Sequence, residues 1–282
     1  MIHTRYVQAS GAFVFRPVEV VRSERVTPQM MRVTFGGESV SEIQSLAADD
    51  DVRIQFPERF DETPLPPVVE FQPFRLVYPA NAPPSVIRAL TIRALRPDQR
   101  EIDIDIALHG VGILTKWAEQ AAPGQRATIG GPRGSTVWEG EPDVFYLIGD
   151  PTALPAIGRF VESLPSGAAA TVVAEVEDAA EEQQWTVPAG ATLTTIWLHR
   201  RGQAPGRTTL LDTAIATLPA PTASTAIFAA GESSTMHRLR RWIRTQWPEI
   251  GKDQLNIAGY WRREDDEQGY FHEGEEETPS DS

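Results

Sequence analysis

The sequence predicts an antiparallel β-barrel followed by an α/β domain built on a parallel sheet. Two observations carry this prediction. The first half holds short strand-like segments separated by turns, and the second half alternates fully apolar strands with helical segments. The character of the chain changes near Pro142. We therefore predict a barrel domain over residues 1–142 and an α/β domain over residues 143–263.

The predicted barrel strands come first along the chain. FRPVEVVRSERV and QMMRVTF flank a Thr-Pro turn, and DVRIQF and VIRALTIRAL are further runs rich in β-branched residues. In REIDIDIALHG, Ile102, Ile104 and Ile106 alternate with acidic residues, which predicts a strand that is buried on one face only. The segment 56–85 is too rich in proline for a central strand and is predicted to be a surface excursion.

A helix and a last strand complete the predicted barrel domain, and strands and helices then alternate. VGILTKWAEQAAPGQ has apolar residues at helical spacing before a Pro-Gly pair, and RATIGGPRGSTV has the composition of a strand broken by glycines. The later predicted strands are VFYLIGD, AAATVVAEVED, ATLTTIWLHR, TAIFAAGE and LNIAGYW, and the helices are PTALPAIGRFVESLP, TLLDTAIATLP and SSTMHRLRRWIRTQW. This alternation predicts a parallel sheet covered on both faces.

The composition excludes several classes of protein. The chain of 282 residues has no cysteine, which excludes disulfides, thiolate metal sites and iron–sulfur clusters. No run approaches the roughly 18 apolar residues of a membrane helix, and the first residues lack the apolar stretch of a signal peptide. We therefore expect a cytoplasmic protein with no membrane insertion. The net charge of −13 argues against nucleic acid as a partner, and residues 264–282 are predicted to be a disordered acidic tail.

Two strand-to-helix turns of the second half are candidate nucleotide-binding sites. The candidate residues in them are Gly149, Asp150, Thr152, Gly231 and Glu232. Parallel strands bring such turns to one edge of the sheet, where ligands usually bind, and the predicted cap of the second helix is Ser233 or Ser234. The GxGxxG fingerprint is absent, and an ordinary strand-to-helix turn is the alternative for each.

Arginines at the end of the strand ATLTTIWLHR indicate a phosphorylated nucleotide. Arg200, Arg201 and Arg207 flank this strand end, where the ribose phosphate of a dinucleotide is usually recognised. They favour NADPH over NADH, and the choice between the two stays open. The arginines on the helix of residues 233–247 are predicted to form a solvated face instead.

Two arginines in the barrel strand RALTIR need an anionic partner. Arg88 and Leu90 point to one side of the strand, and Thr91 and Arg93 point to the other. A buried arginine without a partner costs several kcal/mol. Two alternatives remain for this anionic partner: the acidic side chains of residues 101–105, or a bound pyrophosphate.

The segment after the acidic strand could hold the same pyrophosphate. His109 and Gly110 lead into the predicted helix, which starts around Ile113, Leu114 and Thr115. Backbone N–H groups at a helix start can bind phosphate. These five residues are therefore candidate cofactor-binding residues.

A family resemblance emerges from these segments taken together. RALTIR, DIDIALHG, KWAEQAAPGQ, GPRGS, YLIGDPTALPAIGRFVESLP, IWLHR, AAGE and IAGYWRR resemble the siderophore-interacting protein family of FAD-dependent ferric-siderophore reductases over residues 10–263. That family is similar to ferredoxin reductases. The resemblance implies a flavin-binding barrel joined to an NAD(P)H-binding α/β domain.

The resemblance also implies roles for particular residues. Arg88, Thr91 and Arg93 match the family motif R-x-Y-T-x-R, with the arginines toward the FAD phosphates and Thr91 toward the isoalloxazine. Leu90 replaces the motif tyrosine and has no hydroxyl to donate, so we expect weaker FAD retention or an altered flavin potential. In related reductases a C-terminal aromatic residue covers the flavin, which makes Trp261 a catalytic candidate alongside Thr91. Core packing is the alternative for Trp261.

The implied activity passes electrons from NADPH or NADH through FAD to a ferric siderophore, which then releases iron(II). The five histidines lack metal-ligand spacing, so we expect no intrinsic metal site, and we expect a monomer. Two alternatives stay open: a general NAD(P)H:flavin oxidoreductase, and a non-catalytic siderophore-binding or sensor protein of the same fold. The class of siderophore is not determined by the sequence.

Overall fold

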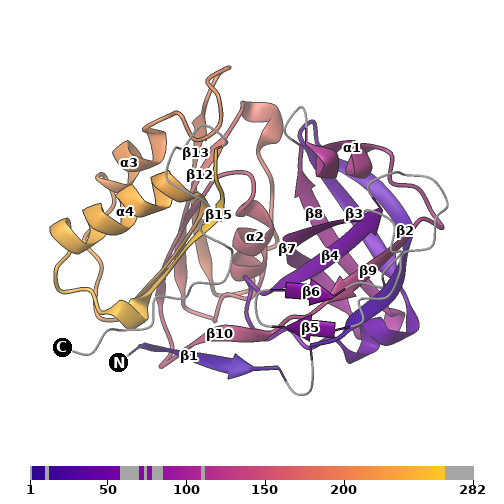
Figure 1. Cartoon of the computed structure of the whole chain (residues 1–282). Coiled ribbons are helices and arrows are strands. Elements are labelled where there is room, and N and C mark those ends of the chain that lie inside the picture. Colours follow the sequence, from indigo (N-terminus) through magenta and orange to yellow (C-terminus); the bar gives the residue numbers. More distant parts are fainter. Residues whose placement is uncertain are drawn as a thin grey trace.

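The computed structural model describes residues 2–9, 13–57, 70–72, 75–77, 85–108 and 112–263. It contains a closed antiparallel barrel and a five-stranded parallel sheet, which lie side by side (Figure 1). The predicted fold class is therefore confirmed. His109, Gly110, most of the proline-rich segment and the predicted acidic tail fall outside the described residues.

Six strands close the barrel in the order β2, β3, β8, β7, β4, β9. Their bounds are β2 Phe15–Thr27, β3 Met30–Gly36, β4 Asp51–Pro57, β7 Ser85–Arg96, β8 Glu101–Ala107 and β9 Arg126–Gly130. Helix α1 (Ile113–Glu119) places Trp117 in the core, with its ring centre 5.8 Å from that of Phe35 and 5.2 Å from that of Phe56. The barrel interior is thus packed, and a ligand must bind at its edge or outer surface.

Strand β10 (Gly134–Glu139) carries the chain from the barrel to the sheet and pairs with the N-terminal strand β1 (His3–Gln8). The sequence predicted one interrupted strand over RATIGGPRGSTV, and the structure separates it into β9 and β10. The peptide bond between Gly131 and Pro132, which lies in this break, is cis. Proline has no N–H to donate, so it cannot continue the ladder. A short hairpin, β5 (Glu70–Gln72) and β6 (Arg75–Val77), adds two strands that were not predicted.

The parallel sheet has the strand order β13, β12, β11, β14, β15. Its strands are β11 Val144–Gly149, β12 Ala169–Val176, β13 Thr192–His199, β14 Thr225–Glu232 and β15 Leu255–Trp261. Helix α2 (Leu154–Glu162) covers the face toward the barrel, whereas α3 (Leu210–Ile215) and α4 (Ser233–Gln246) cover the opposite face (Figure 1). Helices on both faces explain why the central strands β11 and β14 are apolar throughout.

The acidic side of β8 is more deeply buried than its alternating sequence predicted. Asp103 and Asp105 are only 5% and 4% exposed. Arg96 donates to Asp103 at 2.7 Å, and Arg32 pairs with Asp105 at 2.7 Å. Burial raises the pKa of Asp103, but hydrogen bonds from Arg96 and Thr34 outweigh it and the pKa is lowered overall. The expectation of an exposed acidic face is wrong because arginines on neighbouring strands cover it.

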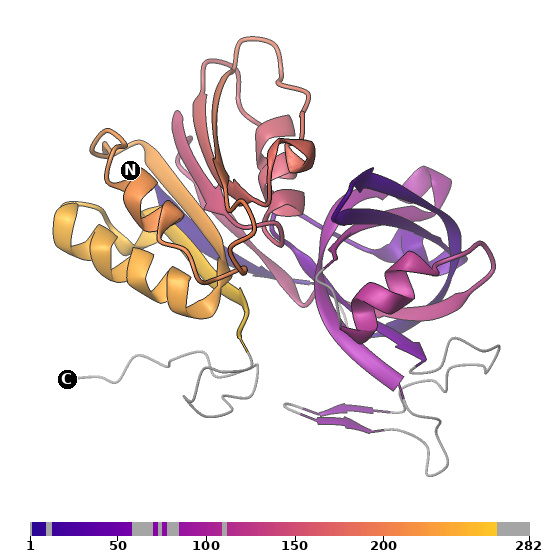
Figure 2. The ribbon, with the colours of Figure 1, turned by 90° about the horizontal axis from the view of Figure 1, so that it is seen from above.

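Helix α2 lies between the sheet and the barrel and joins them through polar side chains (Figure 2). The guanidinium of Arg159 donates to the carbonyls of Ala48 and Ile92, at 3.3 and 3.1 Å. It also donates to the hydroxyl of Ser45 at 2.9 Å. The contact between the barrel and the parallel sheet is called the seam below. At this seam, Glu181 accepts hydrogen bonds from the turn between β2 and β3. These bonds hold the two units in a defined relation, so side chains from both can form one site.

Candidate functional site

The first half of β7 has an edge that β8 does not cover. Residues 85–91 pair with β4 on one side, whereas pairing with β8 begins only at Ile92 and then shifts in register. Leu90 on this stretch packs against the same barrel core as Ile113 and Leu114 at the start of α1. The segment RALTIR and the start of α1 therefore contact the same barrel core, and their shared role in a cofactor site stays a prediction.

Arg88 is the exposed cation at this edge. One of its terminal nitrogens donates to the carbonyl of Ile87 at 2.9 Å, and within the described ranges no carboxylate lies in ion-pair distance of it. Leu90, Ile113 and Leu114 add a half-buried apolar surface, whereas Thr115 is only 3% exposed and is less accessible than predicted. A guanidinium without a carboxylate partner among the described residues, beside an apolar surface and a strand edge that β8 leaves uncovered, fits the phosphates and ring of a flavin dinucleotide.

The other side of β7 faces β15 of the parallel sheet. Thr91 is buried, and its hydroxyl is hydrogen-bonded to that of Tyr260 near the end of β15. Burial raises the pKa of Tyr260, so the phenol stays protonated. The aromatic residue of β15 that contacts Thr91 is thus Tyr260. Neighbouring side chains of a strand point to opposite faces, so Trp261 does not share this contact, and its role at a flavin stays a prediction.

Arg93 is engaged inside the protein. Its two terminal nitrogens donate to the two carboxylate oxygens of Glu162 on α2, at 2.8 and 2.7 Å. Its Nε atom lies 3.8 Å from Asp105. Arg93 therefore pairs mainly with Glu162, a partner that the sequence did not indicate, and links the barrel to α2. Its predicted role at the FAD phosphates stays a prediction.

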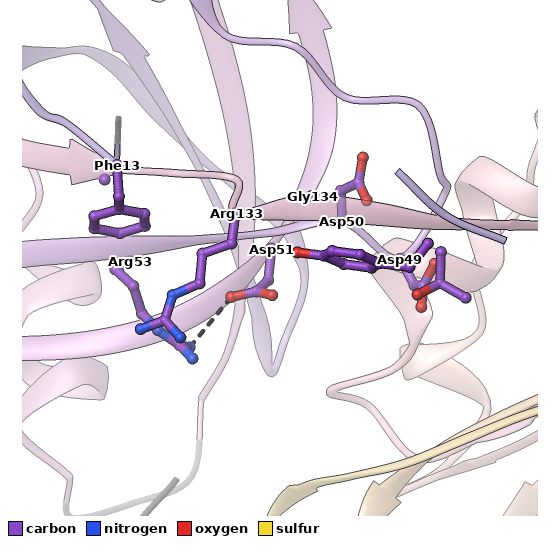
Figure 3. Close-up of a pocket in the computed structure, with 10 residues that line it drawn as sticks. Phe13, Asp49, Asp50, Asp51, Arg53, Arg133 and Gly134 are labelled. Atoms are coloured by element: carbon purple, nitrogen blue, oxygen red, sulfur yellow. Dashed lines mark hydrogen bonds and ion pairs between the residues drawn. The ribbon is translucent and has the colours of Figure 1, made fainter. Parts of the chain in front are cut away.

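A pocket of about 190 Å³ opens beside β4 and the start of β10 (Figure 3). It is lined by Tyr6, Phe13, Asp49, Asp50, Asp51, Arg53, Gly130, Arg133, Gly134 and Thr136. The guanidinium of Arg133 lies 5.5 Å from the ring centre of Phe13, and Arg53 pairs with Asp51 at 3.2 Å. An aromatic ring and two cations thus lie at one end, with Asp49 and Asp50 at the other.

Asp49 has distinctive surroundings in this pocket. Its Oδ2 atom accepts a hydrogen bond from the side-chain amide of Asn256 on β15, at 2.7 Å. Its Oδ1 atom is buried and accepts no hydrogen bond from any residue that the structure describes. Burial raises the pKa of Asp49 to about 6, and hydrogen bonds from Asn256 and from the backbone N–H of Asp49 itself only partly offset this. Asp49 therefore titrates much closer to neutrality than an ordinary aspartate.

Asp150 joins the two strand-to-helix turns predicted to bind a nucleotide. Its carboxylate accepts from the backbone and hydroxyl of Thr152, at 2.9 and 2.6 Å. It also accepts from the backbone N–H of Glu232 at 2.9 Å and from the indole of Trp261 at 2.7 Å. Burial raises its pKa, and these bonds oppose the rise. A Cβ on Gly231 would lie 2.6 Å from Asp150, so this close approach requires glycine.

The cap of α4 differs from the prediction. The carboxylate of Glu232, rather than Ser233 or Ser234, accepts from the backbone N–H groups of Ser234 and Thr235, at 3.0 and 2.8 Å. A carboxylate suits this position because it also balances the positive end of the helix dipole. Glu232 is 1% exposed, so it supports the turn and does not present its side chain to a ligand.

The arginines at the end of β13 divide into two kinds. Arg200 is 2% exposed and lies between two carboxylates, 3.2 Å from Glu177 and 3.9 Å from Glu175. The expectation that Arg200 reads a ribose phosphate is therefore corrected, because its charge is used inside the protein. Arg201 and Arg207 are exposed near the same edge of the sheet and remain candidates for that role.

Trp261→Phe is expected to lower the free energy of unfolding by about 1–2 kcal/mol, because it removes the indole N–H that donates to the buried Asp150 carboxylate. Urea unfolding followed by circular dichroism measures the loss. Trp242→Phe on α4 is a matched control, since it makes the same change at a half-exposed site away from Asp150. Equal losses in the two variants would show that the indole bond contributes nothing specific.

Sequence reasoning missed most of the pocket. Asp49 and Arg53 come from β4 or the turn before it, Arg133 from the segment after β9, and Phe13 from the N-terminal segment, so only closure of the barrel brings them together. The run of three aspartates at 49–51 was a usable signal, because consecutive acidic residues before a strand need separate environments.

The described residues lack membrane-spanning helices and clusters of metal ligands. No helix in the described part of the chain is long and apolar enough to span a membrane. Within the same residues, no group of three histidine, aspartate or glutamate side chains is arranged to hold a metal ion.

Comparison with known proteins gives matches along almost the whole chain. The model of the siderophore-interacting FAD-binding domain matches residues 19–136, and that of the siderophore-interacting protein matches residues 142–264. A solved siderophore utilization protein from T. fusca is 35% identical, with a TM-score of 0.80 over 93% of this chain and 97% of that one. A ferredoxin reductase of carbazole 1,9a-dioxygenase, 14% identical with a TM-score of 0.63 over 89% of this chain and 71% of that one, shares the fold.

Two curated relatives have named activities. The ferric vibriobactin reductase ViuB of Vibrio cholerae is 29% identical over 92% of this chain and 93% of its own length. The NADPH-dependent ferric-chelate reductase of Escherichia coli is 28% identical over 88% of this chain and 92% of its own length. With both halves of the chain matched by family models in this order, the protein belongs to the siderophore-interacting protein family.

Proposed function

We propose that this protein is an FAD-dependent reductase that passes electrons from NAD(P)H to a ferric siderophore and so releases iron(II). The observation that carries the proposal is the free edge of β7, where Arg88 lacks a carboxylate partner in the described part of the chain and Thr91 meets the α/β unit. The names of the two curated relatives support a ferric substrate.

Bound FAD would supply the step between a two-electron donor and a one-electron acceptor. The chain's own residues bind and enclose it. Arg88 binds the phosphates, and Leu90, Ile113 and Leu114 pack beside the cofactor. Thr91 and Tyr260 border the ring from the seam, where burial excludes water.

The pocket beside β4 suits the ferric siderophore. Arg53 and Arg133 provide positive charge for an anionic chelate, and Phe13 offers an aromatic surface to the ligand's rings. Asp51 holds Arg53 in place by an ion pair that an incoming anion can replace. The pocket adjoins Thr91, because Asp51 pairs directly with Thr91 across β4 and β7.

The edge of the parallel sheet suits the nicotinamide donor. Asp150 fixes the two turns that border this edge, and Arg201 and Arg207 favour the phosphorylated form, NADPH. Trp261 lies over this edge, with its carbonyl accepting from Ser233 and its indole donating to Asp150. Since NAD(P)H is an intracellular reductant, we place the activity in the cytoplasm, and the site needs residues of one monomer only.

An absorption spectrum of the full chain tests the proposal. We expect purified protein supplied with FAD to show the bands of oxidised flavin, to lose them anaerobically with NADPH, and to regain them when a ferric siderophore is added. A chelator specific for iron(II) measures the product. Failure to bind FAD would reject the proposal, and bleaching that no ferric chelate reverses would reject its substrate.

Leu90 supports a second candidate, a general NAD(P)H:flavin oxidoreductase that releases its flavin. Leucine cannot donate a hydrogen bond to the cofactor, so the bound flavin can exchange rapidly with free flavin. Steady-state rates with free flavin and with ferric siderophores separate the two candidates. A colourless protein that cannot be reconstituted would instead favour a siderophore-binding protein without turnover.

A further inference from the structure

Asp49 lies where the two units and the flavin strand meet. It precedes β4, whose first residue Asp51 pairs with Thr91 of the flavin motif. From the other unit, β15 contributes Asn256, which donates to Asp49, and Tyr260, which is hydrogen-bonded to Thr91 and feels the charge of Asp49. A change of charge on Asp49 is therefore felt on both sides of the seam.

The two carboxylates at 49 and 50 are used differently. The Oδ2 atom of Asp50 accepts hydrogen bonds from Ser45, Leu46, Ala47 and Ser135, at 2.7 to 3.0 Å, which accounts for it as a structural group. The Oδ1 atom of Asp49 is buried without any such bond from the described residues. A buried acceptor without a donor is destabilising, and such groups concentrate at functional sites.

The charges that face Asp49 come from three elements. Asp50, its neighbour in the chain, raises its pKa, and Arg159 of α2 lowers it. Tyr260 of β15 is neutral, and the remaining charged groups of the pocket are Asp51, Arg53 and Arg133. Burial is the largest influence and, with the others, raises the pKa of Asp49 to about 6. The carboxyl therefore responds to a small change in nearby charge.

We propose that the Asp49 carboxyl takes up a proton when FAD bound at the seam is reduced and releases it when FAD is oxidised. This inference rests on the proposed function, because it requires flavin beside β7. Bound FAD would gain negative charge on accepting a hydride, and a nearby like charge disfavours the carboxylate form of Asp49. Proton uptake by Asp49 keeps the net charge of the seam constant through the reduction.

The protons and electrons balance over one cycle. NAD(P)H would supply a hydride, and water would supply one proton to Asp49. Two ferric ions would then take one electron each, with release of the proton of the hydride and of the proton held by Asp49. Overall, one NAD(P)H reduces two iron(III) to two iron(II) and releases one proton, so Asp49 stores a proton without consuming one.

The midpoint potential of bound FAD, measured against pH by spectroelectrochemistry on the full chain, tests the inference. With Asp49 active, reduction takes up two protons per two electrons between the pKa of Asp49 in this structure, about 6, and the higher pKa that a nearby negative charge gives it. In that range the slope is expected to be about twofold steeper than in Asp49→Asn, which takes up one proton throughout. Glu19→Gln, which changes an exposed carboxyl on β2 away from the seam, is the matched control and should keep the wild-type slope.

A second variant protects the test if Asp49→Asn loses FAD. Asn256→Ala removes the donor to the Asp49 carboxylate, which raises the pKa of Asp49 and should move the steep range to higher pH. Equal slopes in wild type and Asp49→Asn, or a range that Asn256→Ala leaves in place, would overturn the role of Asp49 while FAD still binds. A wild-type protein that binds no FAD would overturn the proposed function as well.

Discussion

Arg88→Glu is expected to abolish FAD retention. Arg88 is exposed at the free edge of β7, and among the described residues no carboxylate competes for it, so its charge is available to the cofactor phosphates. A hydrogen bond to a charged group contributes about 1.5–3 kcal/mol, and about 1.4 kcal/mol is a tenfold change in affinity. Arg88→Ala should therefore weaken binding about 10- to 100-fold. Arg88→Glu adds repulsion and should exceed about 100-fold.

Titration of FAD into apoprotein, followed by flavin fluorescence, measures this loss. Arg126→Glu makes the same charge reversal on β9, at a side chain that is 66% exposed and remote from the free edge of β7, and should bind FAD like the wild type. Comparable affinity in Arg88→Glu and Arg126→Glu would remove Arg88 from the cofactor site. A loss in both variants would point to a general effect of protein charge.

Breaking the pair between Arg93 and Glu162 is expected to destabilise the protein by about 2–3 kcal/mol. Removing one partner of a buried ion pair typically costs about 3–5 kcal/mol, and Glu162 retains 33% side-chain exposure, which reduces the cost. Arg93→Ala should have the larger effect, because Arg93 is only 12% exposed and also lies near Asp105. Chemical unfolding of both single variants and of the double variant measures the coupling.

The same variants separate two roles for Arg93. If Arg93 links the barrel to α2, Arg93→Ala and Glu162→Gln should both lose stability, and the double variant should lose less than their sum. If Arg93 binds a phosphate, Arg93→Ala alone should weaken FAD binding, with Glu162→Gln unaffected. The bidentate geometry at 2.8 and 2.7 Å favours the first outcome.

The strands and helices were largely predictable because hydrophobic periodicity and turn residues are local signals. β2, β3, β4, β7 and β8 and all five parallel strands lie where the sequence placed them. The missing elements depend on distant partners. β1 is a strand because it pairs with β10. The paired residues His3 and Glu139 are 136 positions apart in the sequence. The burial of Asp103 and Asp105 likewise depends on arginines from other strands.

The site was predictable only in part. The strand RALTIR and the turn at Asp150 were found from sequence, since each is a local motif. The ion-pair partner of each charged group could not be predicted. Arg93 and Arg200 pair with carboxylates on other elements of the fold. Alternation along β15 fixed which aromatic faces Thr91, and a shift of one residue exchanges Tyr260 for Trp261.

The pairing of β1 with β10 has a mechanical consequence. β10 is the single covalent bridge from barrel to sheet, and β1 runs beside it along its whole length (Figure 1). Near the far end of this ribbon, Thr4 donates to Asp253 beside β15. A single extended segment would bend freely, whereas two strands that are hydrogen-bonded to each other resist bending. The first residues of the chain thus set how rigidly the barrel is held against the parallel sheet.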